Sequence, residues 1–417
     1  MNELYLFCVK FVLCIFIIPS LAAPELKLLH VLFTHKLYVP KENDAESNVT
    51  NIPEILLYQY FTSATMEMPT KANLNMYNLG MYLRERYDEF LGNTYTFDVS
   101  KMHTTEYALS MLSGQLVNAG LWPPATNQIW LAGFNWQPIP SEYQNLEEDT
   151  LLLGFLCPNF ISQVDQVLRS TEMQNKTAKY QVLFNYLSRY TSRNISTPTD
   201  VALLYAALET MADQNKTLPN WAIDVFPDGA MYNVTLLEYD LLSATPLQRQ
   251  LNGGTLLKEI IGNSLNYKIG DLSKERKIIL YSGGERNIIG ILKNLNLWSP
   301  HIPNEAAALI FELYFDKATN VYGMKINYYT DGATISLTLP NCTEICPLQT
   351  LINITFDLIP EDPQSLCGWP VKNFIEMEDQ LEESKEIDIT DCNGSVLYHS
   401  EKLLLIFISL CFALFNV

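Results

Sequence analysis

Apolar and polar positions alternate along the first third of the chain in a way that predicts strands and helices in turn. Leu26–Phe33 is an apolar run, which is typical of a strand buried on both faces of a parallel sheet. The pattern then predicts a helix over Asn75–Leu91 despite one glycine, a strand over Thr94–Met102 and a helix over Thr105–Ala119. This order of elements favours a fold built from strands and covering helices.

The same alternation returns near the other end of the sequence. Lys277–Tyr281 predicts another short strand, Ser282–Gly284 a turn, and Asn287–Leu295 a helix. Residues 322–342 alternate around an Asp-Gly dipeptide, which predicts a β-hairpin. Strands that alternate with helices indicate an α/β fold with a largely parallel sheet.

The middle of the chain, residues 131–251, has a different character. Lys179–Ser192 and Val201–Asn215 carry apolar residues at helical spacing, and the second helix has Thr199 or Asp200 as its N-terminal cap. We interpret this segment as a helical cap over the carboxyl end of the sheet. The α/β core then comprises residues 24–130 and 252–375.

The first 22 residues have the pattern of a signal peptide. Phe11–Ile18 is apolar, one lysine precedes it, and Ser20-Leu21-Ala22 fits a cleavage site with small residues. The alternative interpretation is an uncleaved anchor helix, but Pro19 and the small residues end the apolar run early. The predicted location is therefore outside the cell, either secreted or attached to the surface.

The last residues favour surface attachment. Residues 376–393 are rich in acidic side chains and predict a solvated stalk. Residues 394–417 end in an apolar run, Leu403–Val417, which is short for a membrane-spanning helix. Small residues at positions 393–395 precede it, so we expect a lipid-anchor signal that is removed, with a membrane tail as the alternative.

Glycosylation motifs and cysteines agree with an extracellular protein. Cys157, Cys342, Cys346, Cys367 and Cys392 remain after the two ends are removed, and we expect disulfides among them. One cysteine is left over, so Cys392 is either free or intermolecular. The Asn-x-Ser/Thr motifs begin at Asn48, Asn175, Asn194, Asn215, Asn233, Asn341, Asn353 and Asn393.

Charge and composition limit the possible functions. The net charge of −19 argues against nucleic-acid binding and works against the accumulation of anionic substrates. No histidine lies near the cysteines in sequence, so we expect no metal site, and nothing indicates a cofactor. With 417 residues and 48% hydrophobic content, the chain is long enough for a sizeable core and more than one domain.

Several motifs in order resemble the histidine acid phosphatases, the family that includes insect venom and prostatic-type enzymes. "LKLLHVLFTHKLYVP" stands where the family has a strand followed by Arg-His-Gly-x-Arg-x-Pro, and "HTTEYALSMLSGQLVNAGLWPP" resembles its Arg-Ser-Thr-Asp-x-x-Arg helix. "IILYSGGERNIIGILKNLNLW" and "LTLPNCTEICPL" also match. The resemblance implies a three-layer fold with a helical cap, and disulfides Cys157–Cys367 and Cys342–Cys346.

In that family a histidine attacks phosphorus, a carboxylic acid protonates the leaving oxygen, and three arginines with a second histidine hold the phosphoryl group. By resemblance the nucleophile position is His35 and the proton-donor position is Glu285. The phosphate-binding positions are substituted by Thr34, Tyr38, Leu109 and Gly284. We expect Leu109 and Tyr38 to place apolar surface where phosphate would sit, and His35 to be satisfied by Glu285.

These substitutions leave three hypotheses. The first is an acid-phosphatase-like glycoprotein with little or no activity that binds an unknown small ligand or a protein. The second is an active phosphatase whose phosphate site is rebuilt from Lys36, Lys101, His103 or Arg286. The third is a structural surface protein without a functional cleft. A homodimer is possible in each case, and whether the protein is an enzyme stays open.

Overall fold

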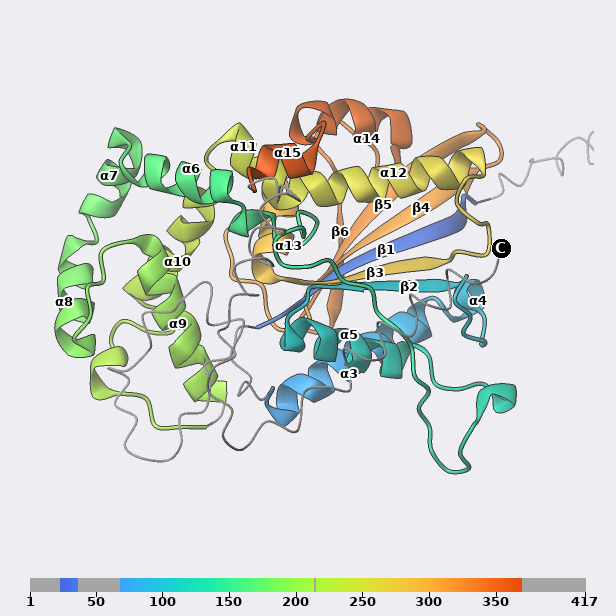
Figure 1. Ribbon diagram of the computed structural model, residues 1–417, viewed down its shortest axis with the longest axis horizontal. Coiled ribbons are helices and arrows are strands. Elements are labelled where there is room, and N and C mark those ends of the chain that lie inside the picture. The colour runs from blue at the N-terminus through green and yellow to red at the C-terminus, as the bar shows by residue number, and fades with distance from the viewer. Residues whose placement is uncertain (1–22, 37–67, 214, 370–417) are drawn as a thin grey trace, which may run out of the picture. The chain divides into compact units, whose positions relative to one another are not determined.

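One sheet organises the residues that the computed structural model describes, which are 23–36, 68–213 and 215–369 (Figure 1). Its strand order is β2-β3-β1-β4-β5-β6, and β7 pairs with β5. The strands are β1 (Glu25–His35), β2 (Ser100–Thr104), β3 (Ile278–Gly284), β4 (Ala308–Asp316), β5 (Val321–Thr330), β6 (Ala333–Leu337) and β7 (Cys346–Pro347). The signal peptide, stalk and tail predictions lie outside the described residues.

Helices fill most of the remaining described chain. They are α3 (Thr70–Arg86), α4 (Asp88–Leu91), α5 (Ala108–Leu121), α6 (Pro158–Leu168), α7 (Thr171–Ala178), α8 (Gln181–Thr191), α9 (Pro198–Asp213), α10 (Ala230–Leu241), α11 (Pro246–Arg249), α12 (Thr255–Ile269), α13 (Glu285–Asn294), α14 (Leu348–Thr355) and α15 (Pro363–Cys367). Among the described residues, no helix is long and apolar enough to cross a membrane.

The sheet is mixed. β1 and β2 both pair with β3 in parallel, whereas β1–β4, β4–β5 and β5–β6 are antiparallel. Leu29, Val31 and Phe33 of β1 face a core shared with α3 and α5, and Leu28 and Leu32 face the opposite core under α12 and α14. This alternation follows from the two-residue period of a strand and gives the predicted α/β sandwich.

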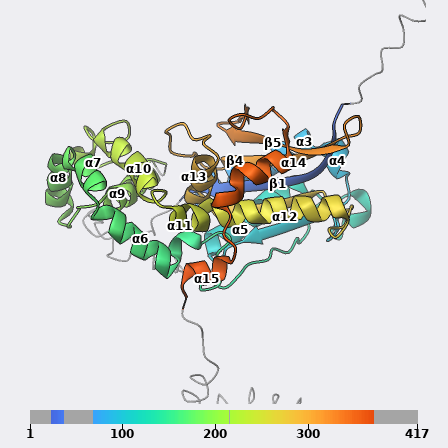
Figure 2. The ribbon, with the colours of Figure 1, turned by 90° about the horizontal axis from the view of Figure 1, so that it is seen from above.

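The helical segment has a core of its own. Side chains from α8, α9 and α10 form it, among them Leu187, Leu204 and Val234, and all three are buried. Figures 1 and 2 both show α7–α10 beyond the end of the sheet at which β1 and β3 finish. These helices are therefore placed to wall a site at the carboxyl edge of the parallel strands.

Three local predictions need correction. The strand predicted over Thr94–Met102 begins only at Ser100, and Ser282–Gly284 continues β3 instead of forming a turn. α9 begins at Pro198, and its cap is Thr197, whose hydroxyl accepts a hydrogen bond from the Asp200 N–H at 3.2 Å. The glycines of β3 hide its length, because they lack the side chains that mark a strand in sequence.

The predictions of two disulfides and a hairpin are confirmed. The structure contains the disulfides Cys157–Cys367 and Cys342–Cys346, and the hairpin turns at Asp331-Gly332, both with positive φ. Of the glycosylation motifs, the six asparagines within the described residues are exposed, as a glycan requires: Asn175, Asn194, Asn215, Asn233, Asn341 and Asn353. Asn48, Asn393 and Cys392 lie outside the described residues.

Candidate active site

The structure brings the two predicted catalytic positions together at one edge of the sheet. His35 is the last residue of β1 and pairs in register with Gly284, the last residue of β3. Glu285 follows immediately and starts α13. Because neighbouring parallel strands lie about 4.8 Å apart, their carboxyl ends present His35 and Glu285 to the same space.

The turn from β3 into α13 depends on glycine. A Cβ atom on Gly283 would lie 2.8 Å from Oδ1 of Asn287, closer than side chains normally pack. That same oxygen accepts the Gly284 N–H at 2.8 Å and caps the helix, while the Asn287 amide donates to the carbonyl of Leu152. The strand therefore passes directly into the helix, with Glu285 in the first turn.

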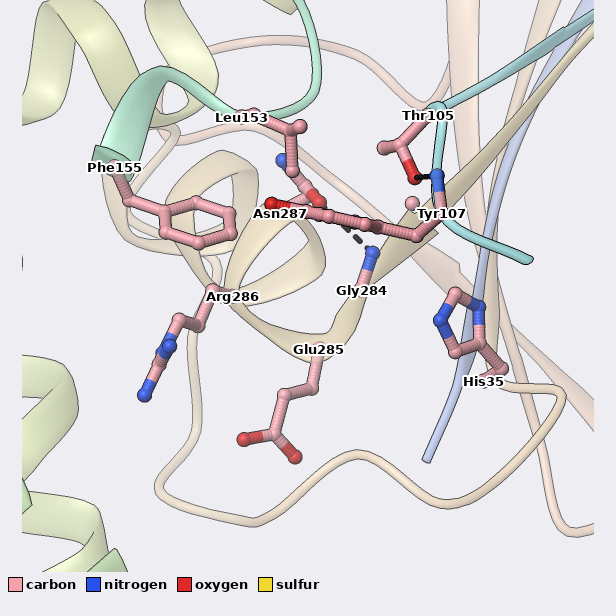
Figure 3. A pocket seen from close by; sticks show the side chains of 10 residues that line it. His35, Thr105, Tyr107, Leu153, Phe155, Gly284, Glu285, Arg286 and Asn287 are labelled. Carbon is pink, nitrogen blue, oxygen red and sulfur yellow. Dashed lines mark hydrogen bonds between the residues drawn. The ribbon is translucent and has the colours of Figure 1, made fainter. Parts of the chain in front are cut away.

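A pocket of about 450 Å³, including its open mouth, lies at this edge. Its lining residues are His35, Thr105, Tyr107, Leu153, Phe155, Gly283, Gly284, Glu285, Arg286 and Asn287 (Figure 3). The walls come from the ends of β1 and β3, the start of α13, and the loops after β2 and before α6. Most of this lining is apolar. Its ionisable side chains are those of His35, Glu285, Arg286 and Tyr107.

His35 is almost completely buried, with 7% of its surface exposed. Its Nδ1 atom has no hydrogen-bond partner, and no hydrogen bond to Glu285 occurs within the described residues, so the expectation that Glu285 satisfies His35 is wrong. Burial lowers the pKa of His35 to about 4, because a charged imidazolium would lose its hydration. The imidazole is therefore neutral near pH 6 and keeps a nucleophilic nitrogen.

The pKa of Glu285 is shifted toward the protonated form, whereas that of His35 is shifted toward the neutral base. Burial raises the pKa of its carboxyl group, Arg286 and a hydrogen bond from Tyr239 lower it, and the nearby carboxylates of Glu238 and Glu209 raise it; together these effects give Glu285 a pKa of about 7. The group is therefore protonated in acid and able to donate a proton. The pair thus retains the protonation states that acid-phosphatase chemistry needs.

The cations near the pocket are already engaged. Arg286 donates to Oε1 of Glu238 at 2.6 Å and lies over the ring of Phe155, and both members of this ion pair are buried. Lys36 lies 3.1 Å from Oε1 of Glu209 and 3.8 Å from Asp213. Each positive charge is thus neutralised by a carboxylate of the cap.

The two remaining candidates for a rebuilt site lie on β2, outside the pocket lining. Lys101 pairs with Glu142 at 2.9 Å. His103 stacks on Tyr281, and burial lowers its pKa to about 4, so it carries no charge near neutrality. No group of three or more metal-ligating side chains occurs in the described part of the chain.

The substituted phosphate-binding positions offer little to an anion. The hydroxyl of Thr34 donates to the carbonyl of His35 at 3.0 Å, and Gly284 has no side chain. Leu109 was expected to line the pocket, but it does not. It lies in the first turn of α5 and packs in the core with Val31 and Phe33. Tyr38 lies outside the described residues.

Two carboxylates that pair with the cations of the site were missed from sequence. Glu209 and Glu238 lie on α9 and α10, about 170 to 200 positions after His35, and no motif connects them to it. A partial signal exists, because Glu238 follows Met231 and Val234 at helical spacing on a face that is otherwise apolar. A carboxylate at a core-facing position is unusual and indicates a buried partner, here Arg286.

Comparison of the sequence with known proteins assigns the chain to a family. The model of the histidine phosphatase superfamily (branch 2) matches residues 21–329. The chain is 32% identical over 371 residues to the venom acid phosphatase of Apis mellifera, covering 88% of this chain and 94% of that protein. Prostatic acid phosphatase of Homo sapiens is 27% identical over 365 residues, with 86% and 92% covered.

Solved structures agree on the fold. The Hafnia alvei phytase in its apo form superposes with a TM-score of 0.59 at 17% identity, covering 84% of this chain and 99% of that one. The chain belongs to the histidine phosphatase superfamily, in the branch that contains these acid phosphatases.

Proposed function

We propose that this protein is a secreted or surface-anchored member of the acid phosphatase family whose hydrolysis of phosphate monoesters is strongly impaired. In this proposal the pocket binds a different small ligand. The observation that carries it is the charge balance at His35. The cations of the described pocket region are paired with carboxylates, and the substituted positions Thr34, Leu109 and Gly284 provide no replacement donor.

The size of the expected loss follows from phosphoryl-transfer physics. Catalysis of this reaction rests on positioning and on charge stabilisation of the transferring group. Removing one donor to such a transition state typically costs about 10²–10³ in rate, and donors that act on one phosphate are not additive. Even partial additivity over four substituted positions removes most of the catalysis.

An acid-pH assay on a generic aryl phosphate tests the proposal. The purified ectodomain should turn over at least ~10³ more slowly than an active relative, and no phosphohistidine should be trapped on His35. Restoring Thr34→Arg, Tyr38→Arg, Leu109→Arg and Gly284→His together should recover part of the activity. Single reversions should recover little, and Leu109→Arg alone should lower stability because that side chain lies in the core.

An active phosphatase with a rebuilt site is the second candidate, and one observation favours it. His35 is neutral and Glu285 is protonated in acid, as the family mechanism requires. Burial also raises the pKa of Glu209, which weakens its ion pair with Lys36 in acid. Robust wild-type hydrolysis that His35→Ala abolishes, and that Lys36→Ala weakens, would replace the impaired-enzyme proposal with this one.

A further inference from the structure

We infer that the pocket beside His35 binds a small organic cation, a primary amine with an apolar body, whose ammonium group pairs with Glu285. The inference rests on the proposed function and specifies its ligand. Two features support it: the charge balance of the pocket and the apolar wall opposite the carboxylate.

The charge balance leaves one carboxylate without a cation. Arg286 pairs with Glu238 and Lys36 pairs with Glu209, but the ion pairs of the described residues include none to Glu285. Figure 3 shows the Glu285 side chain between those of Arg286 and His35 in that view. A cationic ligand would supply the missing counter-charge, whereas a phosphate or carboxylate ligand would meet repulsion at the same position.

The His35 ring lines the same pocket and is neutral, because burial lowers its pKa to about 4. It therefore brings no positive charge that would compete with a ligand cation for Glu285. Its Nδ1 atom is buried without accessible surface or a hydrogen-bond partner, so the contact to the ammonium group comes from Glu285.

The apolar wall selects the rest of the ligand. Phe155, Leu153 and Tyr107 line the pocket together with the backbone of Gly283 and Gly284. An aromatic or aliphatic body packed on these side chains gains the usual stabilisation from burying apolar surface. A hydrated metal ion would leave that surface exposed, which favours an organic amine.

Binding should depend on pH with a predictable sign. A ligand ammonium with a pKa near that of lysine stays charged below about pH 10. Glu285 must lose its proton to pair with it, so the association constant should fall about tenfold per pH unit below pH 7. The ionisable groups that face Glu285 are Arg286 on its own helix, Glu238 and Tyr239 on α10, Glu209 and Tyr205 on α9, and His35 on β1.

Calorimetry with three ring-matched probes tests the inference on the whole ectodomain. Phenethylamine should bind at pH 8, phenethyl alcohol should bind about 10–100-fold more weakly, and phenyl phosphate should not bind. Glu285→Gln should lower amine affinity by a similar factor and remove its pH dependence. His35→Gln, which leaves Glu285 in place, should keep that dependence.

Glu344→Gln is the matched control, because Glu344 is an exposed carboxylate paired with Lys325, far from the pocket in the fold. It should bind the amine as the wild type does. Equal affinity for amine and alcohol, or unchanged amine binding in a folded Glu285→Gln variant, would overturn the inference while leaving the loss of phosphatase activity intact. Tight binding of phenyl phosphate would instead overturn the proposed function.

Discussion

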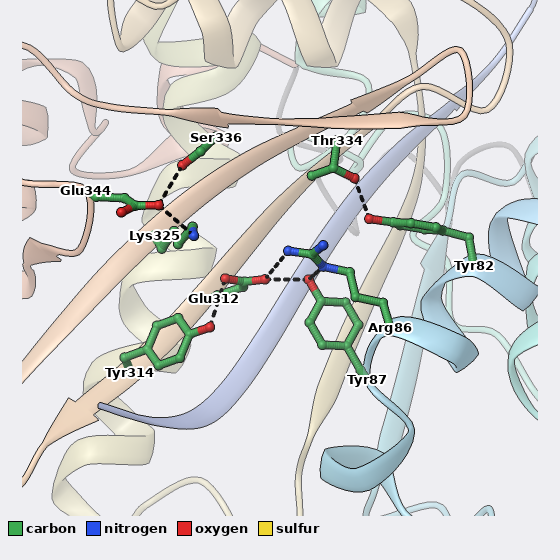
Figure 4. A network of polar contacts seen from close by, with 9 residues as sticks. All are labelled: Tyr82, Arg86, Tyr87, Glu312, Tyr314, Lys325, Thr334, Ser336 and Glu344. Carbon is green, nitrogen blue, oxygen red and sulfur yellow. Dashed lines mark hydrogen bonds and ion pairs between the residues drawn. The ribbon is translucent and has the colours of Figure 1, made fainter. Parts of the chain in front are cut away.

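Two polar regions of this protein differ in how completely their buried carboxylates are paired with donors and cations. Glu312 on β4, 1% exposed, accepts a hydrogen bond from Tyr87 at 2.6 Å, another from Tyr314 at 3.1 Å, and an ion pair from Arg86 at 3.3 Å (Figure 4). Glu285 at the pocket has no cation within ion-pair distance among the described residues, and its neighbour His35 keeps an unpartnered nitrogen.

The difference distinguishes polar groups that hold the fold together from polar groups that are available to a ligand. Both of the Glu312 oxygens receive donors, so this carboxylate fastens the end of α3 and the turn after it to β4. Nothing is left over for a ligand. The pocket instead retains a carboxylate without a cation, Glu285, beside a histidine nitrogen without a partner, and perturbed groups of this kind concentrate where a protein binds or reacts.

Removing Glu312 should have the largest effect on stability. Glu312→Ala removes the acceptor of Tyr87 and Tyr314 and the counter-charge of Arg86, and each hydrogen bond to a charged group contributes about 1.5–3 kcal/mol. Urea unfolding at pH 6 would measure this as a large fall in the midpoint. Glu344→Ala, which removes an exposed carboxylate in the loop before β7, should leave the midpoint unchanged. An equal fall in both variants would contradict the comparison.

His35 should have the next largest effect, and only in acid. Its pKa is about 4 in the folded protein and about 6.5 when unfolded, so the unfolded chain binds a proton first as pH falls. The free energy of unfolding should therefore decrease between pH 6.5 and pH 4, by up to about 3 kcal/mol from this group. His35→Gln should flatten part of that decrease in urea titrations.

In the His35→Gln variant the free energy of unfolding should still decrease in acid, because His30 contributes as well. That side chain is fully buried, its Nδ1 contacts the hydroxyl of Tyr281, and burial lowers its pKa to about 3. An acid slope identical in the wild type and the variant would show that His35 is solvated, and would remove the contrast with the fully satisfied Glu312.

Glu285 should have the smallest effect on the free energy of unfolding. Its contribution should decrease as the pH rises, whereas that of His35 decreases as the pH falls. Its folded pKa of about 7 exceeds the usual 4.5, so the unfolded chain loses its proton first as pH rises. Stability from this group is complete below pH 4.5 and lost by pH 7. Because the side chain is partly exposed, we expect about 1–2 kcal/mol. Glu285→Gln should abolish this slope, and a slope that persists would place the raised pKa elsewhere.

Sequence reasoning recovers the elements better than their junctions. The apolar runs of β1 and β3 and the hairpin at Asp331-Gly332 are visible because side-chain period and turn chemistry are local properties. The extension of β3 through Ser282–Gly284 is not visible, because it depends on pairing with Phe33–His35, more than 240 positions earlier.

The residues of the site likewise fall into those that sequence reasoning can predict and those that it cannot. His35 and Glu285 follow from resemblance to the family, since each lies in a recognisable motif. The Glu209 and Glu238 carboxylates that occupy Lys36 and Arg286 come from the cap, and only the folded chain brings them near. The position of Leu109 in the core, away from the pocket, likewise depends on the way α5 packs on the sheet.

The Cys157–Cys367 disulfide makes most of the described chain a covalent ring. The two cysteines are 210 positions apart, and every helix of the cap, together with strands β3–β7, lies between them. A protease that cuts one exposed loop of the cap would therefore open the ring without separating the pieces. Such a nicked protein would migrate as one species until a reductant is added, and it would keep both sides of the pocket attached to each other.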